Sequence, residues 1–218
     1  MTAHAFDAPD PAAAEALQRP PEPLSETLRK LPELPAEPLT VRAIADAVAD
    51  RSLGAILTLF AIVNCIPGPP GTSFILGLPV VIVAAQMLAG QRTVWLPRRI
   101  ADIAIPRTGF GNSLARILPW LTYVERFLRP RYWPFSRLAA ERLVGIVSLL
   151  LGIIIVLPIP LGNGVTAFAV ALLGLALSER DGLWLLAGLA VAAMATLFAG
   201  SVIAGAAWAA TAAMGAGG

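Results

Sequence analysis

The polar residues that could do chemistry in the apolar part of this chain gather around two proline-glycine breaks. Five of them carry an amide or a hydroxyl: Asn64, Thr72, Ser73, Asn163 and Thr166, and a sixth such residue, Gln86, stands apart, deeper in its segment. Such groups can satisfy the backbone atoms that proline leaves without partners, or they can line a small polar site. In the second interpretation, the helix N-termini after the breaks add donors for an anion. The pattern therefore predicts either caps of broken helices or a substrate-binding site.

Other kinds of site chemistry find little support in the sequence. His4 is the single histidine and Cys65 the single cysteine, so there is no metal-ligand cluster and no serine-histidine pair. There is no phosphate-binding glycine loop, and no charged residue lies inside the apolar segments, which disfavours proton coupling. We therefore expect no catalytic residue, no metal and no cofactor, and no nucleic acid among the partners.

The composition is that of a membrane protein. Apolar residues make up 57% of the 218 residues and charged residues 14%, and the mean hydropathy is strongly positive. Soluble domains carry about 25% charged residues. A chain of this length has room for one membrane domain and a tail.

The breaks divide the apolar part into short helices, so we expect an all-α polytopic fold with two helical hairpins. The apolar segments lie at about 52–66, 72–90, 143–157, 163–178 and 183–214. The first four are shorter than the roughly 20 residues of a spanning helix. The breaks turn at Pro67, Pro69, Gly71, Pro158, Pro160 and Gly162. Each hairpin is then either a thin spanning hairpin or a re-entrant loop, and we favour the re-entrant form.

The two breaks share the pattern Pro-x-Pro-x-Gly at an offset of 91 residues. At the same offset Ile62 matches Ile153 and Ala85 matches Ala176. Internal repeats of interrupted helices are typical of transporter folds, so the spacing predicts an internal repeat with paired tips.

Outside the hairpins, the N-terminal tail, the connection 91–142 and the turn at 179–181 are expected on the cytoplasmic side, and 183–214 is a C-terminal membrane segment. Residues 1–40 are rich in proline and predict a disordered tail that is retained. Thr40 can cap a helix through about Arg51, with an apolar face that suits the membrane interface. The last segment, 183–214, is about 48 Å long as a straight helix. It must tilt strongly, project from the bilayer or break, and a break would fall near Gly200-Ser201.

The connection 91–142 holds ten arginines against three acidic residues, which predicts a cytoplasmic location. Its apolar stripe indicates one or two amphipathic helices on the inner leaflet. Four arginines are candidates for lipid headgroup phosphates: Arg98, Arg99, Arg126 and Arg129. The alternative is that the arginines fix the topology and bind nothing specific.

Several motifs, in order along the chain, resemble the ExoD family. The first hairpin reads Asn-Cys-Ile-Pro-Gly-Pro-Pro-Gly-Thr-Ser at 64–73, with Ala-Ala-Gln at 84–86. The connection carries Trp-Leu-Pro-Arg-Arg at 95–99. The second hairpin carries Leu-Pro-Ile-Pro-Leu-Gly-Asn at 157–163 and leaves through Ser-Glu-Arg-Asp-Gly at 178–182. The resemblance implies a multi-pass protein of the bacterial inner membrane associated with exopolysaccharide synthesis, and it transfers no catalytic residue.

Two functions remain open. The protein could transport or handle an anionic lipid-linked precursor, or it could be a scaffold for polysaccharide-synthesis enzymes that binds them through its arginine-rich connection. Membrane lipids are expected partners in both. Small residues in 187–214 also permit close packing of helices, including between two copies in a homodimer.

Overall fold

The structure is a computed structural model that describes residues 24–30, 38–48, 52–65, 72–91, 93–105, 107–133, 135–157 and 162–215. Every regular element in these ranges is a helix, so the predicted all-α class is confirmed. The helices are α2 (Leu24–Lys30), α3 (Val41–Asp46), α4 (Leu53–Asn64), α5 (Thr72–Leu88), α6 (Arg98–Ala101), α7 (Arg107–Phe127), α8 (Arg137–Val156), α9 (Gly162–Glu179) and α10 (Gly182–Gly215).

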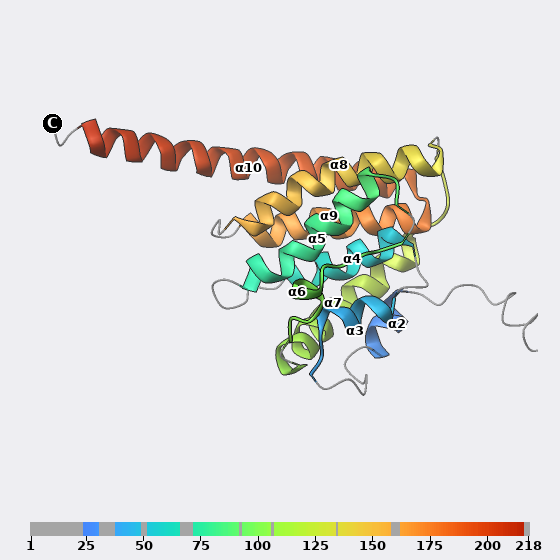
Figure 1. The fold of residues 1–218 in the computed structure, drawn as a ribbon. Helices are drawn as coiled ribbons and strands as arrows, with labels where there is room; N and C mark the ends of the chain where they lie inside the picture. The colour runs from blue at the N-terminus through green and yellow to red at the C-terminus, as the bar shows by residue number, and fades with distance from the viewer. Residues whose placement is uncertain are drawn as a thin grey trace, which may run out of the picture.

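The helices stack in three layers (Figure 1). One side holds α8, α9 and α10, the middle holds α4 and α5, and the other side holds the short or amphipathic helices α2, α3, α6 and α7. The most extensive contacts run between the hairpins, since α4 packs on α9 and α5 packs on α8. The first helix of each hairpin therefore packs against the second helix of the other hairpin.

Glycines allow these two crossings to be close. A Cβ added at Gly54 on α4 would lie 2.6 Å from the carbonyl oxygen of Gly174 on α9. A Cβ added at Gly145 on α8 would lie 2.8 Å from the backbone nitrogen of Leu88 on α5. Gly54 and Gly145 are 91 residues apart, the same offset that separates the two proline-glycine breaks.

The predicted hairpin segments match the helices well, but the turns themselves lie outside the described residues. This holds for Pro67, Pro69, Gly71, Pro158 and Pro160, whereas Gly162 begins α9. The largest difference is at α8, which begins at Arg137 and not near residue 143. Ser136 caps this helix by accepting a hydrogen bond from the backbone N–H of Ala139.

Of the three alternatives for the last segment, a break near Gly200 is excluded, because α10 is one continuous helix from Gly182 to Gly215. A single glycine costs a helix only about 1 kcal/mol relative to alanine, and the surrounding alanines favour the helix. Beyond the bundle, α10 projects alone (Figure 1). A Cβ added at Gly200 or Gly205 would accordingly meet nothing within 4 Å.

The disorder predicted for residues 1–40 does not hold for the stretch 24–30, which forms α2. Leu24 and Leu28 are buried, and α2 packs on α7. The backbone N–H of Ser25 donates to Oε1 of Glu125 over 2.9 Å, and its hydroxyl donates to Oε2. A helix of about two turns with two leucines on the same face is enough to dock here, despite the prolines around it.

Two apolar faces predicted to lie on lipid are covered by the protein itself. Thr40 caps α3 as expected, but α3 ends at Asp46, and its residues Val41 and Ile44 are buried. On α7, Leu121 and Val124 of the apolar stripe are buried as well. Ring stacking between Trp120 of α7 and Phe168 of α9, with centroids 4.8 Å apart, also holds α7 against the bundle.

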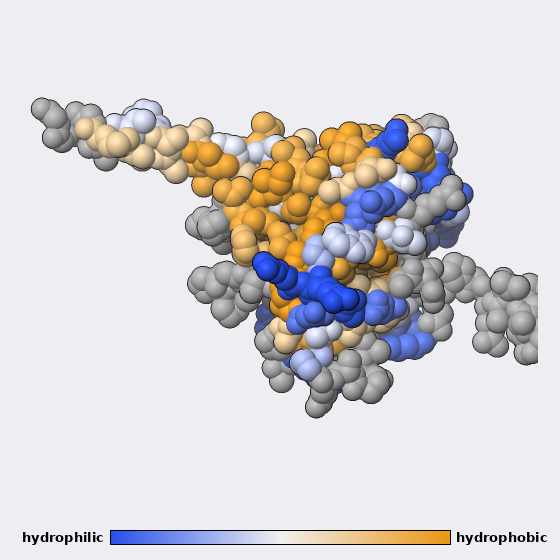
Figure 2. Space-filling model, in the orientation of Figure 1, coloured by the Kyte–Doolittle hydropathy of each residue, from blue (hydrophilic) through white to orange (hydrophobic). Residues whose placement is uncertain are grey.

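Two of the described helices are long and apolar enough to cross a membrane, Arg137–Val156 and Gly182–Ala212. Figure 2 shows a hydrophobic surface over the layer of α8 and α10, whereas hydrophilic residues gather over the layer of α3 and α6. The exposed side chains of the hydrophobic layer include Ile146, Leu150, Ile153, Leu186, Met194 and Leu197. The surface is therefore strongly divided into an apolar and a polar side.

Candidate functional site

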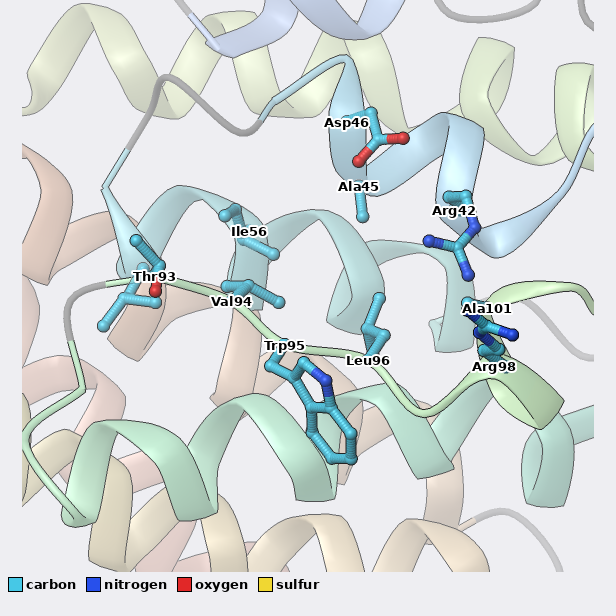
Figure 3. Close-up of a pocket in the computed structure, with 11 residues that line it drawn as sticks. Arg42, Ala45, Asp46, Ile56, Thr93, Val94, Trp95, Leu96, Arg98 and Ala101 are labelled. Atoms are coloured by element: carbon cyan, nitrogen blue, oxygen red, sulfur yellow. The ribbon is translucent and has the colours of Figure 1, made fainter.

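A pocket of about 330 Å³ lies where the polar layer meets the bundle (Figure 3). Its walls come from α3, the first turn of α4, the extended segment 93–96 and α6. The lining residues are Arg42, Ala45, Asp46, Leu53, Ile56, Thr93, Val94, Trp95, Leu96, Arg98 and Ala101. The pocket combines an apolar floor with two arginines and a carboxylate.

The extended wall of this pocket is fixed by Gln86. This side chain is buried on α5, and its Oε1 accepts a hydrogen bond of 2.9 Å from the backbone N–H of Trp95. Its Nε2 donates to the carbonyl oxygen of the same residue. Gln86 was predicted to bind substrate, but both ends of its amide are used to hold the chain at Trp95. Its contribution to a site is therefore to position the pocket wall.

A short backbone pairing holds the wall made by α3. The N–H of Val41 donates to the carbonyl of Ile103 over 3.1 Å, and the N–H of Ile105 donates to the carbonyl of Leu39 over 2.7 Å. These bonds tie the start of α3 to the chain that follows α6. The residues Arg42 and Arg98, which are far apart in the sequence, are thereby brought to one pocket.

The charges of the pocket are incompletely compensated. Arg42 contacts Oδ1 of Asp102 at 3.4 Å, and both side chains of this pair are well exposed. Within the described residues Arg98 has no ion-pair partner, and Asp46 has none either. Guanidinium groups in such a setting suit an anion with several oxygens, because each offers several N–H donors in one plane.

The predicted asparagines lie at the closed ends of the two hairpins and join their helices. Nδ2 of Asn64 donates to the carbonyls of Phe60 and Leu76, each over 2.9 Å, and so links α4 to α5. Nδ2 of Asn163 donates to the carbonyl of Ile155 over 3.1 Å, linking α9 to α8. In both residues the Oδ1 atom is buried and has no hydrogen-bond partner in the part of the chain that the structure describes. Capping of the helix ends accounts for the hydrogen bonds that the two Nδ2 groups donate. It does not account for the two buried Oδ1 atoms.

The two hairpin ends lie next to each other. A Cβ added at Gly164 would lie 3.5 Å from the carbonyl oxygen of Cys65, so the residues beside Asn64 and Asn163 are in contact. A cavity of about 190 Å³ opens beside Cys65 and is lined mainly by apolar side chains. Its one charged lining residue is Arg116 of α7.

The other predicted binding residues do not gather into one described site. Thr166 is buried on α9 and has a partner, and the side chains of Thr72 and Ser73 lie outside what the structure describes. Of the four arginines predicted to bind headgroups, only Arg98 lines the large pocket, and Arg99 is its exposed neighbour. Arg126 lies in the last turn of α7, and Arg129 lies just beyond its end.

Sequence reasoning missed the contribution of α3 to the pocket. Arg42 and Asp46 are four residues apart on the polar face of that helix, which reads as a solvated surface. One signal could have indicated this contribution. A helix this short is not stable alone, so Val41 and Ile44 must pack on the bundle, and Arg42 and Asp46 lie opposite them.

Comparison with known proteins places the chain in a family. The model of the family described as "Exopolysaccharide synthesis, ExoD" matches residues 24–201. The chain is 26% identical over 171 residues to Protein ExoD of Rhizobium meliloti, which covers 76% of this chain and 71% of that protein. It is 30% identical over 158 residues to an uncharacterized protein of Synechocystis, covering 71% of this chain and 74% of that protein. No solved structure gives a significant match. Because the family model covers most of the sequence, this chain belongs to the ExoD family.

Proposed function

We propose that this protein is a multi-pass protein of the bacterial inner membrane that supports exopolysaccharide synthesis by handling an anionic lipid-linked precursor. It would move or present this precursor without making or breaking a bond. The family description supplies the process. The handling of a ligand is carried by one observation: at adjoining hairpin ends, two buried amide oxygens have no partner among the described residues and can accept hydrogen bonds from hydroxyl groups such as those of the precursor's sugar.

The division of the surface supports the membrane location. The exposed apolar side chains of α8 and α10 form a continuous face, which soluble monomers rarely carry at this size. The open ends of the two hairpins lie together, since Oγ of Ser52 is 3.0 Å from Oγ of Ser178. Both hairpins then return the chain to one side of the bilayer, where the arginine-rich connection begins and ends.

This topology predicts the side on which each segment can be labelled. In a Cys65→Ser background, a cysteine replacing Thr108 on α7 should resist an impermeant maleimide in spheroplasts and react after permeabilisation. A cysteine replacing Met214, near the end of α10, should react from outside, because α10 leaves the cytoplasmic face and crosses once. Labelling of the Thr108 position in intact spheroplasts would contradict the proposed orientation.

The arrangement of the helices also supports an internal repeat with an approximate two-fold axis. At the shared offset of 91 residues, Gly54 is equivalent to Gly145. Each of these glycines contacts the last turns of the second helix in the opposite hairpin. Such an axis would place the two proline-glycine turns side by side, which agrees with the contact between Cys65 and Gly164. We propose that the turns enter the bilayer from the same side as paired re-entrant tips.

The buried acceptors give a test of the handling function. Asn64→Ala and Asn163→Ala should each cost about 1–3 kcal/mol of stability through lost hydrogen bonds. Polysaccharide output should fall further than the amount of folded protein, because the acceptors for the ligand are also removed. Both quantities are measured in the same cells, by the polysaccharide secreted and by the folded protein that membranes yield.

Ser148→Ala is the matched control for these variants. The Oγ atom of Ser148 is also buried without a partner, but it lies in the middle of α8 and away from the hairpin ends. Its removal should leave output and stability unchanged. If output in the asparagine variants follows the folded protein alone, the two amides are structural caps and the handling function loses its support.

The scaffold function remains the second candidate because of α7. Its apolar stripe is held on the bundle, so its exposed face is free to contact another protein. That face presents Arg116, Tyr123 and Arg126. A scaffold would lose output on substitution of these residues and would keep it when Asn64 or Asn163 is replaced.

A further inference from the structure

We propose that the pocket between α3, α4, segment 93–96 and α6 binds the phosphorylated head group of a lipid. The inference rests on the proposed function and deepens it, because it assigns the precursor's charged end to residues away from the hairpin tips. Figure 3 shows Arg42 and Arg98 at the same end of the pocket, with Asp46 above them.

The two arginines favour an anionic ligand. The contact of Arg42 with Asp102 is long, at 3.4 Å, and exposed pairs of this kind contribute little to stability. It engages Nε and one terminal nitrogen of the guanidinium, which leaves further N–H donors of Arg42 for a ligand. Arg98 adds to the same cavity a guanidinium that has no ion-pair partner among the described residues. A phosphate matches this set, because its oxygens accept two parallel bonds from each arginine.

The remaining polar residues of the pocket indicate which groups lie beside the phosphate in the ligand. The carboxylate of Asp46 and the hydroxyl of Thr93 also line the pocket. A carboxylate repels a bare phosphate, but it accepts hydrogen bonds from hydroxyl or ammonium groups. The head group that fits best therefore carries hydroxyls or an amine beside its phosphate. A phosphorylated sugar has this chemistry.

The position of the pocket favours a lipid over a soluble phosphate compound. The hydrophilic surface over α6 borders the hydrophobic surface of the bundle (Figure 2), which is where lipid phosphates lie. Trp95, whose side chain is exposed, stands on the extended wall, and tryptophan is typical of the membrane interface. The apolar floor of Ile56 and Leu96 can cover the first carbons of an acyl or prenyl chain.

Equilibrium binding to the purified full-length protein in nanodiscs tests the assignment. The ligands are a polyprenyl phosphate that carries a sugar, the corresponding uncharged polyprenol and inorganic phosphate. We expect the polyprenyl phosphate to bind at least about tenfold more tightly than either of the others, since one charge-assisted hydrogen bond is worth about tenfold in affinity. Arg98→Ala and Arg42→Ala should each weaken it by about tenfold or more.

Two controls separate the pocket from general charge effects. Arg99→Ala removes an equal charge from the exposed neighbour of Arg98 and should change the affinity less than twofold. Asp102→Asn removes the ion pair of Arg42 without touching the pocket lining, and it should not weaken binding, because it frees donors of Arg42 and removes a negative charge beside the site. Equal binding of polyprenol, or equal losses in Arg98→Ala and Arg99→Ala, would overturn the head-group site. If inorganic phosphate binds as tightly as the polyprenyl phosphate, the ligand of the pocket is a soluble phosphate and not a lipid head group.

Polysaccharide output of the same variants distinguishes this inference from the proposed function. If Arg98→Ala loses binding and output stays normal, the pocket stands and the handling function fails. If polyprenyl phosphate binds regardless of Arg42 and Arg98, the pocket fails and the handling function stands.

Discussion

Replacing Gly182 with alanine is expected to remove nearly all folded protein, the largest effect of any single methyl group in the described chain. A Cβ at this position would lie 2.0 Å from the carbonyl oxygen of Tyr132, far inside van der Waals contact. The obstacle is backbone and not the end of a flexible side chain, so it cannot rotate away. We expect a loss of more than about 4 kcal/mol, which is exceptional for a point substitution.

The surroundings of Gly182 explain why this backbone cannot move. The N–H of Gly182 donates to the carbonyl of Arg131 over 2.9 Å. The carboxylate of Asp181 is fully buried, where it accepts from Nε of Arg131 at 3.1 Å and from the backbone N–H groups of Arg129 and Leu183. A buried carboxylate that loses these donors is strongly destabilising, so the chain before α8 and the start of α10 must stay together.

The measurement is the yield and thermal unfolding of the purified protein in detergent. Gly200→Ala, in the same helix, is the matched control, because its added Cβ meets nothing within 4 Å. That variant should be neutral or more stable, since alanine favours a helix by about 1 kcal/mol over glycine. Equal yields and melting temperatures for the two variants would show that Tyr132 and Gly182 do not approach as described.

The turn at 178–182 shows which features can be predicted from the sequence and which cannot. The run at 178–182 stands out as a motif, and the helices on either side follow from their apolar pattern. Its physical role depends on Arg129, Arg131 and Tyr132, which lie 50 residues earlier and carry no local signal. Positive φ angles at Tyr132 and Arg180, of 51° and 54°, belong to this junction as well. Contacts of that range are set by the tertiary fold and not by periodicity.

The apolar faces of α3 and α7 show a second limit of prediction from the sequence. The pattern in α3 and α7 identifies a helix with one apolar side, and both helices form, although α3 ends at Asp46 and not near Arg51. It cannot say whether lipid or protein covers that side, because both are equally apolar. In α7, Leu121 and Val124 lie against protein. The consequence for the site is large, since packing α3 on the bundle turns a solvated Arg42 into part of a pocket.

Gly174→Ala is expected to have the second largest effect, because α4 and α9 approach each other at this residue without any side chain between them. A Cβ here would lie 2.5 Å from Oγ1 of Thr58 and 2.6 Å from the carbonyl oxygen of Gly54. The hydroxyl of Thr58 is itself held by that carbonyl, over 2.8 Å, so neither obstacle can leave alone. Separating the two helices would open the centre of the bundle, where Leu57 and Leu173 are fully buried.

The expected cost of Gly174→Ala is about 3 kcal/mol, the upper part of the range for overpacking a core, and it should appear as a lower melting temperature in detergent. Gly205→Ala, on the part of α10 that projects beyond the bundle, should not lower it, because no atom lies within 4 Å of its added Cβ. Gly145→Ala tests the other crossing, where a Cβ would meet the backbone of Ala84 and Leu88 on α5. If the two crossings are related by an internal two-fold axis, both core variants should lose stability and Gly205→Ala should not. A melting temperature for Gly174→Ala equal to that of Gly205→Ala would mean that the hairpins do not cross at this distance, and the paired-tip arrangement would lose its geometric basis.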